Sequence, residues 1–301
     1  MTTYGFRRLA FAGALVIGLT GVAAPARATT SPNPLDPIIN LLGPVPAPYV
    51  PYTGAACPTG ARSCIDTTIA EMKRRLAMLA PTCSHDAVFS LAYLRVTEDV
   101  RDAMDAGHFA DRTWLSQVDA NFAHKYFDTL DAWRSGNKKA VPQAWQIALQ
   151  ASEDRSVSGL GSFMLAMNAH INRDFSYVLA EVGLTAKDGT SHKADHNAYN
   201  PRLDALYIPV FTEEAARFDP TFDDFDLGTL DDTTVGVIMR GWREMVWRNA
   251  ERLVLAKTPF EKMLAEQIIE NYATTQAVMI RALFATPNSQ TRDNWCATHH
   301  G

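Results

Sequence analysis

The chain has 301 residues, and its composition is that of an ordinary globular protein, with 47% hydrophobic and 20% charged residues. This length is enough for one large domain, or a domain with a tail, and for a substantial buried core. The formal net charge is −5, so the chain lacks the basic excess needed to follow a phosphate backbone. The charge balance therefore argues against a dedicated nucleic-acid-binding protein.

Residues 1–28 are predicted to be an export signal. Two adjacent arginines precede an apolar run at 9–24, and the Ala-Arg-Ala sequence at 26–28 has the small-x-small pattern that signal peptidase cleaves. We therefore expect a secreted protein whose mature chain begins near Thr29. No later segment is long and uncharged enough to cross a bilayer, so no integral membrane span is expected after cleavage.

Residues 29–56 are rich in proline and are predicted to form an extended arm rather than a domain. Over residues 57–301, apolar residues recur with helical spacing and show hardly any strand-like alternation. The spacing predicts helices at 65–80, 86–106, 112–134, 142–152, 158–183, 196–217, 232–257 and 259–285. Pro142 and Pro259 stand at predicted helix starts, where a missing N–H costs nothing, and Thr258 is a suitable N-cap. The predicted fold is an all-α bundle of about eight helices with a proline-rich N-terminal arm.

Four cysteines follow the predicted signal: Cys57, Cys64, Cys83 and Cys296. An even number in an exported protein favours two disulfides, for which three pairings are formally available. Cys64 and Cys83 lie near opposite ends of a predicted helix, over ~20 Å apart at ~1.5 Å of rise per residue, whereas a disulfide needs Cα atoms within ~7 Å. We therefore prefer the pairs Cys57–Cys64 and Cys83–Cys296. A zinc-thiolate site is not favoured, because the chain has no CxxC pair.

The predicted helix at 158–183 carries the most informative pattern. At 100° per residue its apolar stripe consists of Leu160, Phe163, Met167, Ile171, Val178 and Val182. Asp174 falls inside this stripe, His170 lies on its edge, and Glu181 falls on the same side, whereas Asn168 and Asn172 project elsewhere. A carboxylate that faces a core needs a compensating partner, and residues at i and i+4 can reach each other or a single ion.

Three interpretations of His170 and Asp174 remain open. They are ligands of a metal ion, with Asp174 anionic and His170 neutral. Alternatively they belong to a buried structural network, in which Asp174 pairs with Arg243 from the inner stripe of the helix at 232–257. The third interpretation is a catalytic or ligand-binding pocket without a metal.

A second group of polar residues follows the long helix across a turn that contains glycine. The segment 191–200 includes His192, Asp195 and His196, and it could fold back over the helix end toward Asp174. Asp195 is equally suited to act as the N-cap of the next helix. The contribution of this segment to a site depends on its proximity to Asp174.

The run Met167-Asn168-Ala169-His170-Ile171-Asn172-Arg173-Asp174 resembles the hallmark of a mainly actinobacterial family of helical proteins of unknown function. Segments 89–98, 119–127 and 243–249 fit the same pattern, so the likeness covers roughly the whole mature domain. This resemblance implies a helical fold and no particular reaction.

The spacing His170-x-x-x-Asp174 on a long buried helix is also similar, more distantly, to that of zinc-dependent phospholipases C and related fungal zinc nucleases. This second resemblance implies zinc or another divalent metal as cofactor, with a bound water that attacks a phosphodiester. No histidine-x-x-x-glutamate pair follows downstream, so the resemblance implies at most a variant with one or two metal ions.

The leading functional hypothesis is a secreted, metal-dependent hydrolase of esters or phosphoesters that acts on a small-molecule or lipid-like substrate. Its metal ligands would be His170, Asp174, His192 and His196, and its catalytic residues would be Arg243, which holds an anionic group, and Asp195. The alternative is a non-catalytic secreted binding protein whose buried His–Asp–Arg network only fixes the core. A carrier of a lipid-like or steroid-like ligand would need a large apolar cavity between helices.

Overall fold

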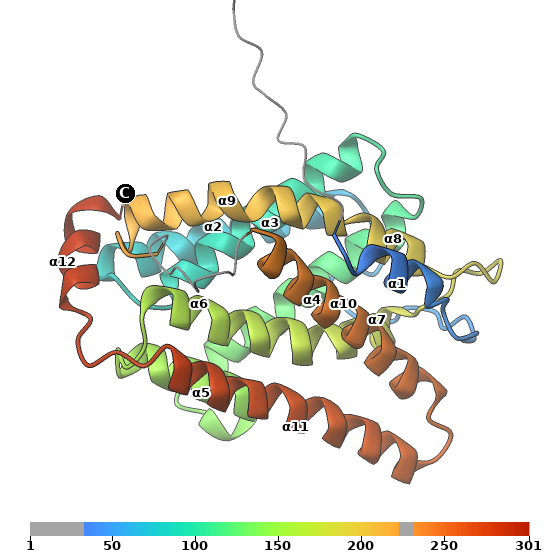
Figure 1. Cartoon of the computed structure of the whole chain (residues 1–301). Helices are drawn as coiled ribbons and strands as arrows, with labels where there is room; N and C mark the ends of the chain where they lie inside the picture. The colour runs from blue at the N-terminus through green and yellow to red at the C-terminus, as the bar shows by residue number, and fades with distance from the viewer. Residues whose placement is uncertain (1–32, 223–231, 301) are drawn as a thin grey trace, which may run out of the picture. The chain divides into compact units, whose positions relative to one another are not determined.

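The chain folds almost entirely into helices and turns. The computed structural model describes residues 33–222 and 232–300, and within them it contains no strand and two isolated backbone bridges (Figure 1). The all-α prediction is confirmed, while the predicted export signal lies outside the described residues. No helix in the described part of the chain combines the length and apolar character needed to cross a membrane.

The helices have the following bounds: α1 Asp36–Leu41, α2 Ser63–Leu79, α3 Ala87–Asp105, α4 Arg112–Arg134, α5 Gln143–Glu153, α6 Gly159–Asn168, a π-helix Ala169–Phe175, α7 Ser176–Val182, α8 Lys193–Ala198, α9 Asn200–Arg217, α10 Asp232–Leu255, α11 Pro259–Leu283 and α12 Gln290–His299. Each of the eight predicted helices is present within a few residues of its predicted ends. The short helices α1, α8 and α12 are additional. Helix α8 is separate from α9 because Pro201 lies in the first turn of α9.

Local capping explains where several helices begin. Thr258 and Glu261 form a capping box at the start of α11, in which the Thr258 hydroxyl accepts the Glu261 N–H at 3.1 Å and the Glu261 carboxylate accepts the Thr258 N–H at 3.0 Å. This confirms Thr258 as an N-cap. Asp111 caps α4 by accepting the N–H of Trp114 at 2.9 Å.

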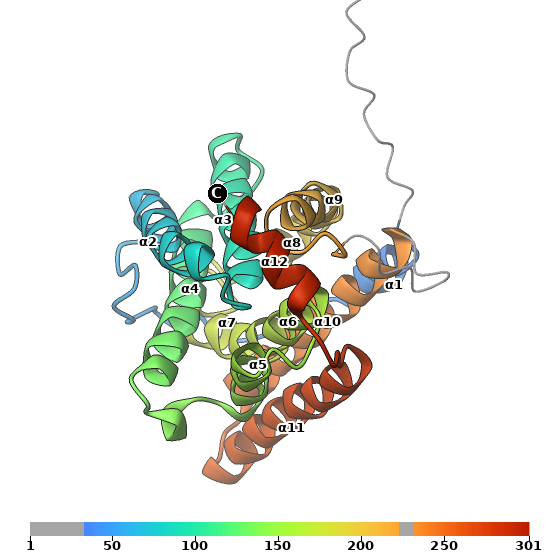
Figure 2. The ribbon, with the colours of Figure 1, turned by 90° about the vertical axis from the view of Figure 1, so that its left-hand side faces the viewer.

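The continuous helix formed by α6, the π-helix and α7 is the central element of the bundle. It contacts α3, α4, α5, α10 and α11, which surround it when the bundle is viewed nearly along its axis (Figure 2). A helix that is covered on several sides is apolar around much of its circumference, and polar side chains within it must find partners inside the protein. This position makes Asn168, His170, Asn172 and Asp174 buried residues.

The proline-rich arm is partly helical and lies against α10. Arg240 pairs with Asp36 of α1 at 2.7 Å. Arg248 donates to the carbonyl oxygens of Leu42 and Gly43, and the N–H of Val45 donates to Glu251 at 2.8 Å. Side chains of α10 therefore bind three main-chain groups of the arm between Leu42 and Val45.

Both predicted disulfides are confirmed. Cys57 and Cys64 have Cα atoms 5.9 Å apart, and Cys83 and Cys296 have Cα atoms 5.8 Å apart. The first closes a short loop before α2. The second attaches α12 to the turn between α2 and α3, which lies 213 residues earlier in the chain.

Candidate functional site

The central helix changes its winding at the candidate residues. Residues 169–175 form a π-helix, in which hydrogen bonds run from i to i+5 and each turn holds more residues than an α-turn. A wheel drawn at 100° per residue therefore assigns wrong directions from Ala169 onward. Single π-turns inside α-helices are rare and are frequent at functional sites, which makes this segment a candidate site.

The structure corrects the directions predicted for three polar residues. Asn168 and Asn172 are buried rather than projecting away from the core: the Asn168 amide donates to the carbonyl of Ala273 in α11 at 2.8 Å, and the Asn172 amide donates to Asn168 at 2.9 Å. Glu181 does not share the inner face. Its side chain is 46% exposed and pairs with Lys125 at 2.8 Å.

Asp174 is completely buried and accepts hydrogen bonds from three side chains. Trp145 Nε1 donates to Oδ2 at 2.7 Å, His170 Nδ1 lies 3.2 Å from the same oxygen, and Arg173 binds Oδ1. Burial by itself would raise the pKa of Asp174, but the bond to His170 and the Arg173 charge outweigh burial and hold it below its ordinary value. Asp174 is therefore an anion.

His170 is the neutral partner of this anion. Burial lowers the pKa of His170 by more than the Asp174 hydrogen bond and charge raise it. A neutral imidazole that donates from Nδ1 to a carboxylate carries a lone pair on Nε2, and His170 Nε2 is buried with no hydrogen-bond partner among the described residues. The pair thus leaves one basic nitrogen available.

Aromatic rings hold the imidazole of His170 in place. The ring stacks on Phe122, with ring centroids 3.6 Å apart and planes within 3°, and Tyr93 meets its edge at 4.7 Å. Phe89 and Trp145 contact it at 5.6 and 5.9 Å. Such packing leaves the imidazole little freedom to rotate.

The His170 side chain lines a cavity of about 420 Å³. The wall is formed mainly by side chains of α3, α6, the π-helix, α9 and α10, and most of them are apolar, including Phe89, Phe163, Met164, Ile171, Leu203 and Trp242. Tyr93, whose buried hydroxyl has no partner, also lines it. The wall of the cavity is mostly apolar and includes a small number of polar groups, which is the usual composition of a ligand pocket.

Arg243 reaches the same cavity from α10 and does not pair with Asp174. Its Nε donates to Asn200 Oδ1 at 2.6 Å, and its Nη2 donates to the carbonyl oxygen of His196. The predicted Arg243–Asp174 ion pair is wrong, because the neighbouring Arg173 supplies the charge that Asp174 needs. Arg243 instead lies over the ring of Phe175, 5.6 Å from its centroid.

The polar loop residues do not join His170 and Asp174. His196 lies beside Arg243, with its Nε2 3.1 Å from the Arg243 carbonyl oxygen. His192 stacks on Trp114 at 4.5 Å. Asp195 is not an N-cap of its own helix: it lies inside α8 and accepts the N–H groups of Ala110 and Asp111 at 2.8 and 2.7 Å, which fixes the start of α4.

The predicted metal ligands are consequently divided among three places. His170 and Asp174 bind each other, His196 lies with Arg243, and His192 lies with Trp114. Across residues 33–222 and 232–300, no three His, Cys, Asp or Glu side chains gather in an arrangement that could hold a metal ion.

Comparison with known proteins identifies the family of this chain. The family of unknown function DUF5995 matches it over residues 65–285. The chain belongs to this family. No curated protein and no solved structure matches the chain. The region shared by the DUF5995 family includes His170, Asp174, Arg243 and the cavity, whereas Cys57, Cys64, Cys296 and α12 lie outside it.

Asp119 is a further buried acid in the DUF5995 region, and the sequence analysis did not select it. Burial raises the pKa of Asp119 to about 7, and its Oδ2 has no hydrogen-bond partner. The acid lies on α4 between Leu115 and Phe122, which pack against the core. Like Asp174, Asp119 is a carboxylate within an apolar stripe of its helix, and this pattern is the sequence signal of its burial.

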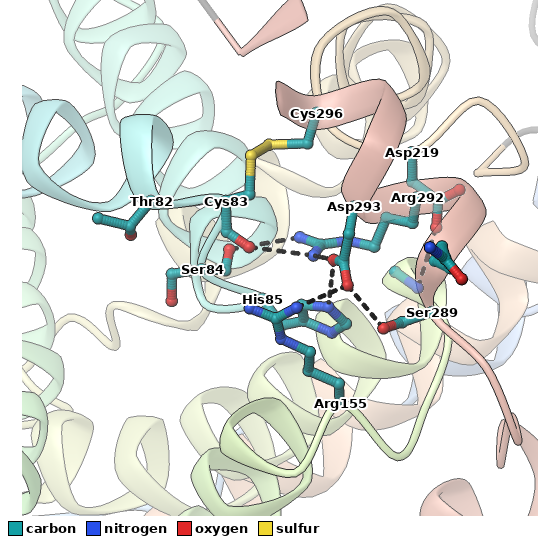
Figure 3. A network of polar contacts seen from close by, with 12 residues as sticks. Thr82, Cys83, Ser84, His85, Arg155, Asp219, Ser289, Arg292, Asp293 and Cys296 are labelled. Atoms are coloured by element: carbon teal, nitrogen blue, oxygen red, sulfur yellow. Dashed lines mark hydrogen bonds and ion pairs between the residues drawn. A yellow bond between two sulfur atoms is a disulfide. The ribbon is translucent and has the colours of Figure 1, made fainter. Parts of the chain in front are cut away.

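A separate buried polar network in this DUF5995 chain attaches α12 to the rest of the protein. Figure 3 shows Arg292 and Asp293 directed toward the turn that contains Cys83 and His85. Arg292 donates to the carbonyl oxygens of Cys83 and Ser84 at 3.2 and 3.3 Å, and Asp293 lies 3.1 Å from His85 Nε2. Burial is the main reason that the pKa of His85 falls to about 4, so this histidine is neutral. The contacts around the Cys83–Cys296 disulfide are those of a structural anchor.

Proposed function

We propose that this protein binds a small, largely apolar ligand in the cavity that His170 and Arg243 line. The observation that carries this proposal is the cavity itself, with a volume of about 420 Å³. Protein interiors are close-packed, and few of their voids exceed a water molecule. Pockets for small molecules typically measure ~300–1,000 Å³ and are mainly apolar with a few polar groups, and this cavity has both properties.

Stability arguments also favour a ligand. The cavity is partly open, and the lining residues Ile208 and Ile238 are exposed, so apolar side chains of its wall contact water. A hydrophobic molecule in the cavity would remove this apolar surface from water. Among the functions considered from the sequence, the carrier of a lipid-like or steroid-like molecule is the one that requires such a space.

The proposed cavity can be tested by filling it. Met164→Trp enlarges a half-buried side chain of the wall, and we expect it to weaken binding of the neutral fluorescent probe N-phenyl-1-naphthylamine by at least ~10-fold. The measurement is a fluorescence titration of the folded protein, with folding checked by thermal melting. The matched control is Met263→Trp on α11, where the side chain is exposed and lies outside the cavity. Equal probe affinity in the two variants would contradict the proposal.

We propose a second candidate function, ester hydrolysis without a metal, on the strength of one observation. In the part of the chain that the structure describes, His170 Nε2 has no hydrogen-bond partner while Nδ1 is oriented by Asp174, and an oriented neutral imidazole is a suitable general base. In this reaction Nε2 takes a proton from a water molecule as its oxygen attacks the ester carbonyl. The proton then passes to the departing alkoxide, which gives a carboxylic acid and an alcohol.

This second candidate predicts a measurable activity. His170→Gln should lower the rate of p-nitrophenyl butyrate hydrolysis at least ~100-fold, the usual range for a lost general base, and should leave binding of the neutral probe within a few-fold. The control variant is His299→Gln in α12, far from the π-helix in the chain. Hydrolysis that is absent in the unmodified protein, or unchanged in His170→Gln, would eliminate this function.

A metal-dependent mechanism receives less support from the donor residues. The likeness to zinc-dependent phospholipases C suggests zinc, which takes three or four protein ligands. Among the described residues the candidate ligands His170, Asp174, His192 and His196 do not converge, so the residues do not fit the ion. Neither function proposed here passes through a metal.

Secretion is part of the proposal. It is supported by the signal-like pattern of residues 1–28 and by two disulfides, which persist in oxidising compartments. A secreted binder of apolar molecules would meet its ligand outside the cytoplasm.

A further inference from the structure

The charge of Arg243 has no counter-ion among the residues that the structure describes. Arg243 is 8% exposed and lines the cavity. Both of its hydrogen-bond acceptors are neutral: the side-chain oxygen of Asn200 and the main-chain oxygen of His196. Within the described residues it forms no ion pair, and its Nη1 makes no hydrogen bond to the protein.

Two acidic residues near Arg243 are already paired with other cations. Asp204, which also lines the cavity, binds Arg240 through both oxygens, at 3.0 and 2.8 Å. Glu244, next to Arg243 in the sequence, binds Lys193 at 2.6 Å and Arg248 at 2.7 Å. Since these carboxylates are occupied, the guanidinium of Arg243 leaves a net positive charge at the cavity wall.

Arg243 keeps this charge at neutral pH. Burial is the main cause that lowers the pKa of Arg243, to about 10, and this is still well above 7. His170, the other basic group on the wall, is neutral for the reasons given above. A buried, unpaired cation is costly for a fold, and an anion that binds it offsets this cost.

We propose that the ligand is an amphipathic carboxylate, with its carboxylate bound to Arg243 and its apolar body in the cavity. The inference rests on the proposed binding function and specifies its ligand class. A carboxylate suits the position because an ionised oxygen makes a strong hydrogen bond to a guanidinium N–H, and Nη1 is the nitrogen that remains available. The aromatic and aliphatic side chains of the wall then enclose the rest of the molecule.

The test compares three ligands that share one twelve-carbon chain. Dodecanoate, 1-dodecanol and dodecylamine compete with N-phenyl-1-naphthylamine for the unmodified protein at pH 7.5. We expect dodecanoate to displace the probe at a concentration at least ~10-fold lower than that of dodecanol, and dodecylamine to be the weakest. Equal displacement by dodecanoate and dodecanol would overturn the inference while leaving the binding function in place.

A substitution tests whether the preference for dodecanoate over dodecanol depends on Arg243. Within Arg243→Met, dodecanoate and dodecanol should displace the probe at the same concentration, whatever the affinity of this variant for the probe, and Arg243→Lys should keep part of the preference. The matched control is Arg252→Met, an exposed residue of the same helix. A carboxylate preference that survives in Arg243→Met would also overturn the inference. If neither the probe nor any of the three ligands binds the unmodified protein, the binding function itself has failed.

Discussion

Asp174→Ala is expected to lower the free energy of unfolding by ~3–5 kcal/mol at pH 7, as found when one member of a buried ionic network is removed. The substitution leaves Trp145 Nε1 and His170 Nδ1 without their acceptor inside the protein and removes an anion next to Arg173. Buried donors without a partner retain their full desolvation cost. Urea denaturation followed by circular dichroism measures the change.

The effect of Asp174→Ala should also depend on pH. The pKa of Asp174 is lower in the folded protein than in the unfolded chain. Its stabilising contribution is therefore present above the ordinary aspartate pKa of ~3.9 and is lost as the pH falls through the depressed value. We expect the two proteins to differ less at pH 3 than at pH 7.

The control for this prediction is Asp128→Ala on α4, an exposed aspartate, which should leave the stability unchanged within error. If Asp174→Ala were as mild as this control, the network around Asp174 would not stabilise the core. Asp174→Asn, which keeps one oxygen acceptor, should lie between Asp174→Ala and the unmodified protein.

The positions of the helices could be predicted from the sequence because amphipathic spacing is a local property. The apolar residues of α2, α3 and α4 repeat with helical periodicity, and Thr258 with Glu261 gives a start signal that depends on four residues only. The disulfide pairing followed from the same information, since the length of α2 keeps Cys64 away from Cys83. Helices of six to ten residues, such as α1, α8 and α12, contain too few turns for a periodic apolar pattern to be recognised in the sequence.

The candidate site could be predicted only in part. The pairing of His170 with Asp174 at i and i+4 follows from local geometry and was correct. Arg243 was correctly expected to point inward. Its partners, Asn200 and His196, could not be predicted because they depend on how distant helices pack together. The direction of Asn172 was predicted wrongly because no residue type in 169–175 indicates an i to i+5 pattern. Asn168, in α6, is buried because the central helix is covered on several sides.

The cavity could not be predicted from the sequence, for a different reason. Its wall consists of residues such as Phe89, Phe163 and Leu203, which in a sequence are indistinguishable from residues that fill a core. Whether they meet or leave a space is decided by how α9 and α10 pack against α3 and α6. The sequence analysis could therefore state only that a carrier would need such a space.

Removing the Cys83–Cys296 disulfide is expected to destabilise the protein by ~5 kcal/mol in the chain-entropy description, in which a cross-link restricts the unfolded chain more as the loop it closes becomes longer. This loop spans 213 residues and encloses nearly the whole family region. The variant is the double substitution Cys83→Ala with Cys296→Ala, and its free energy of unfolding is measured by urea denaturation under non-reducing conditions.

The other disulfide provides the matched control, because Cys57→Ala with Cys64→Ala also removes two sulfur atoms from buried or half-buried positions but opens a loop of only seven residues. The same description gives ~2.5 kcal/mol for it. A difference of ~2–3 kcal/mol between the two double variants would mean that the long loop matters mainly through the unfolded chain. Equal losses would contradict the chain-entropy description for the long loop, because the expected difference comes only from the separations of 7 and 213 residues.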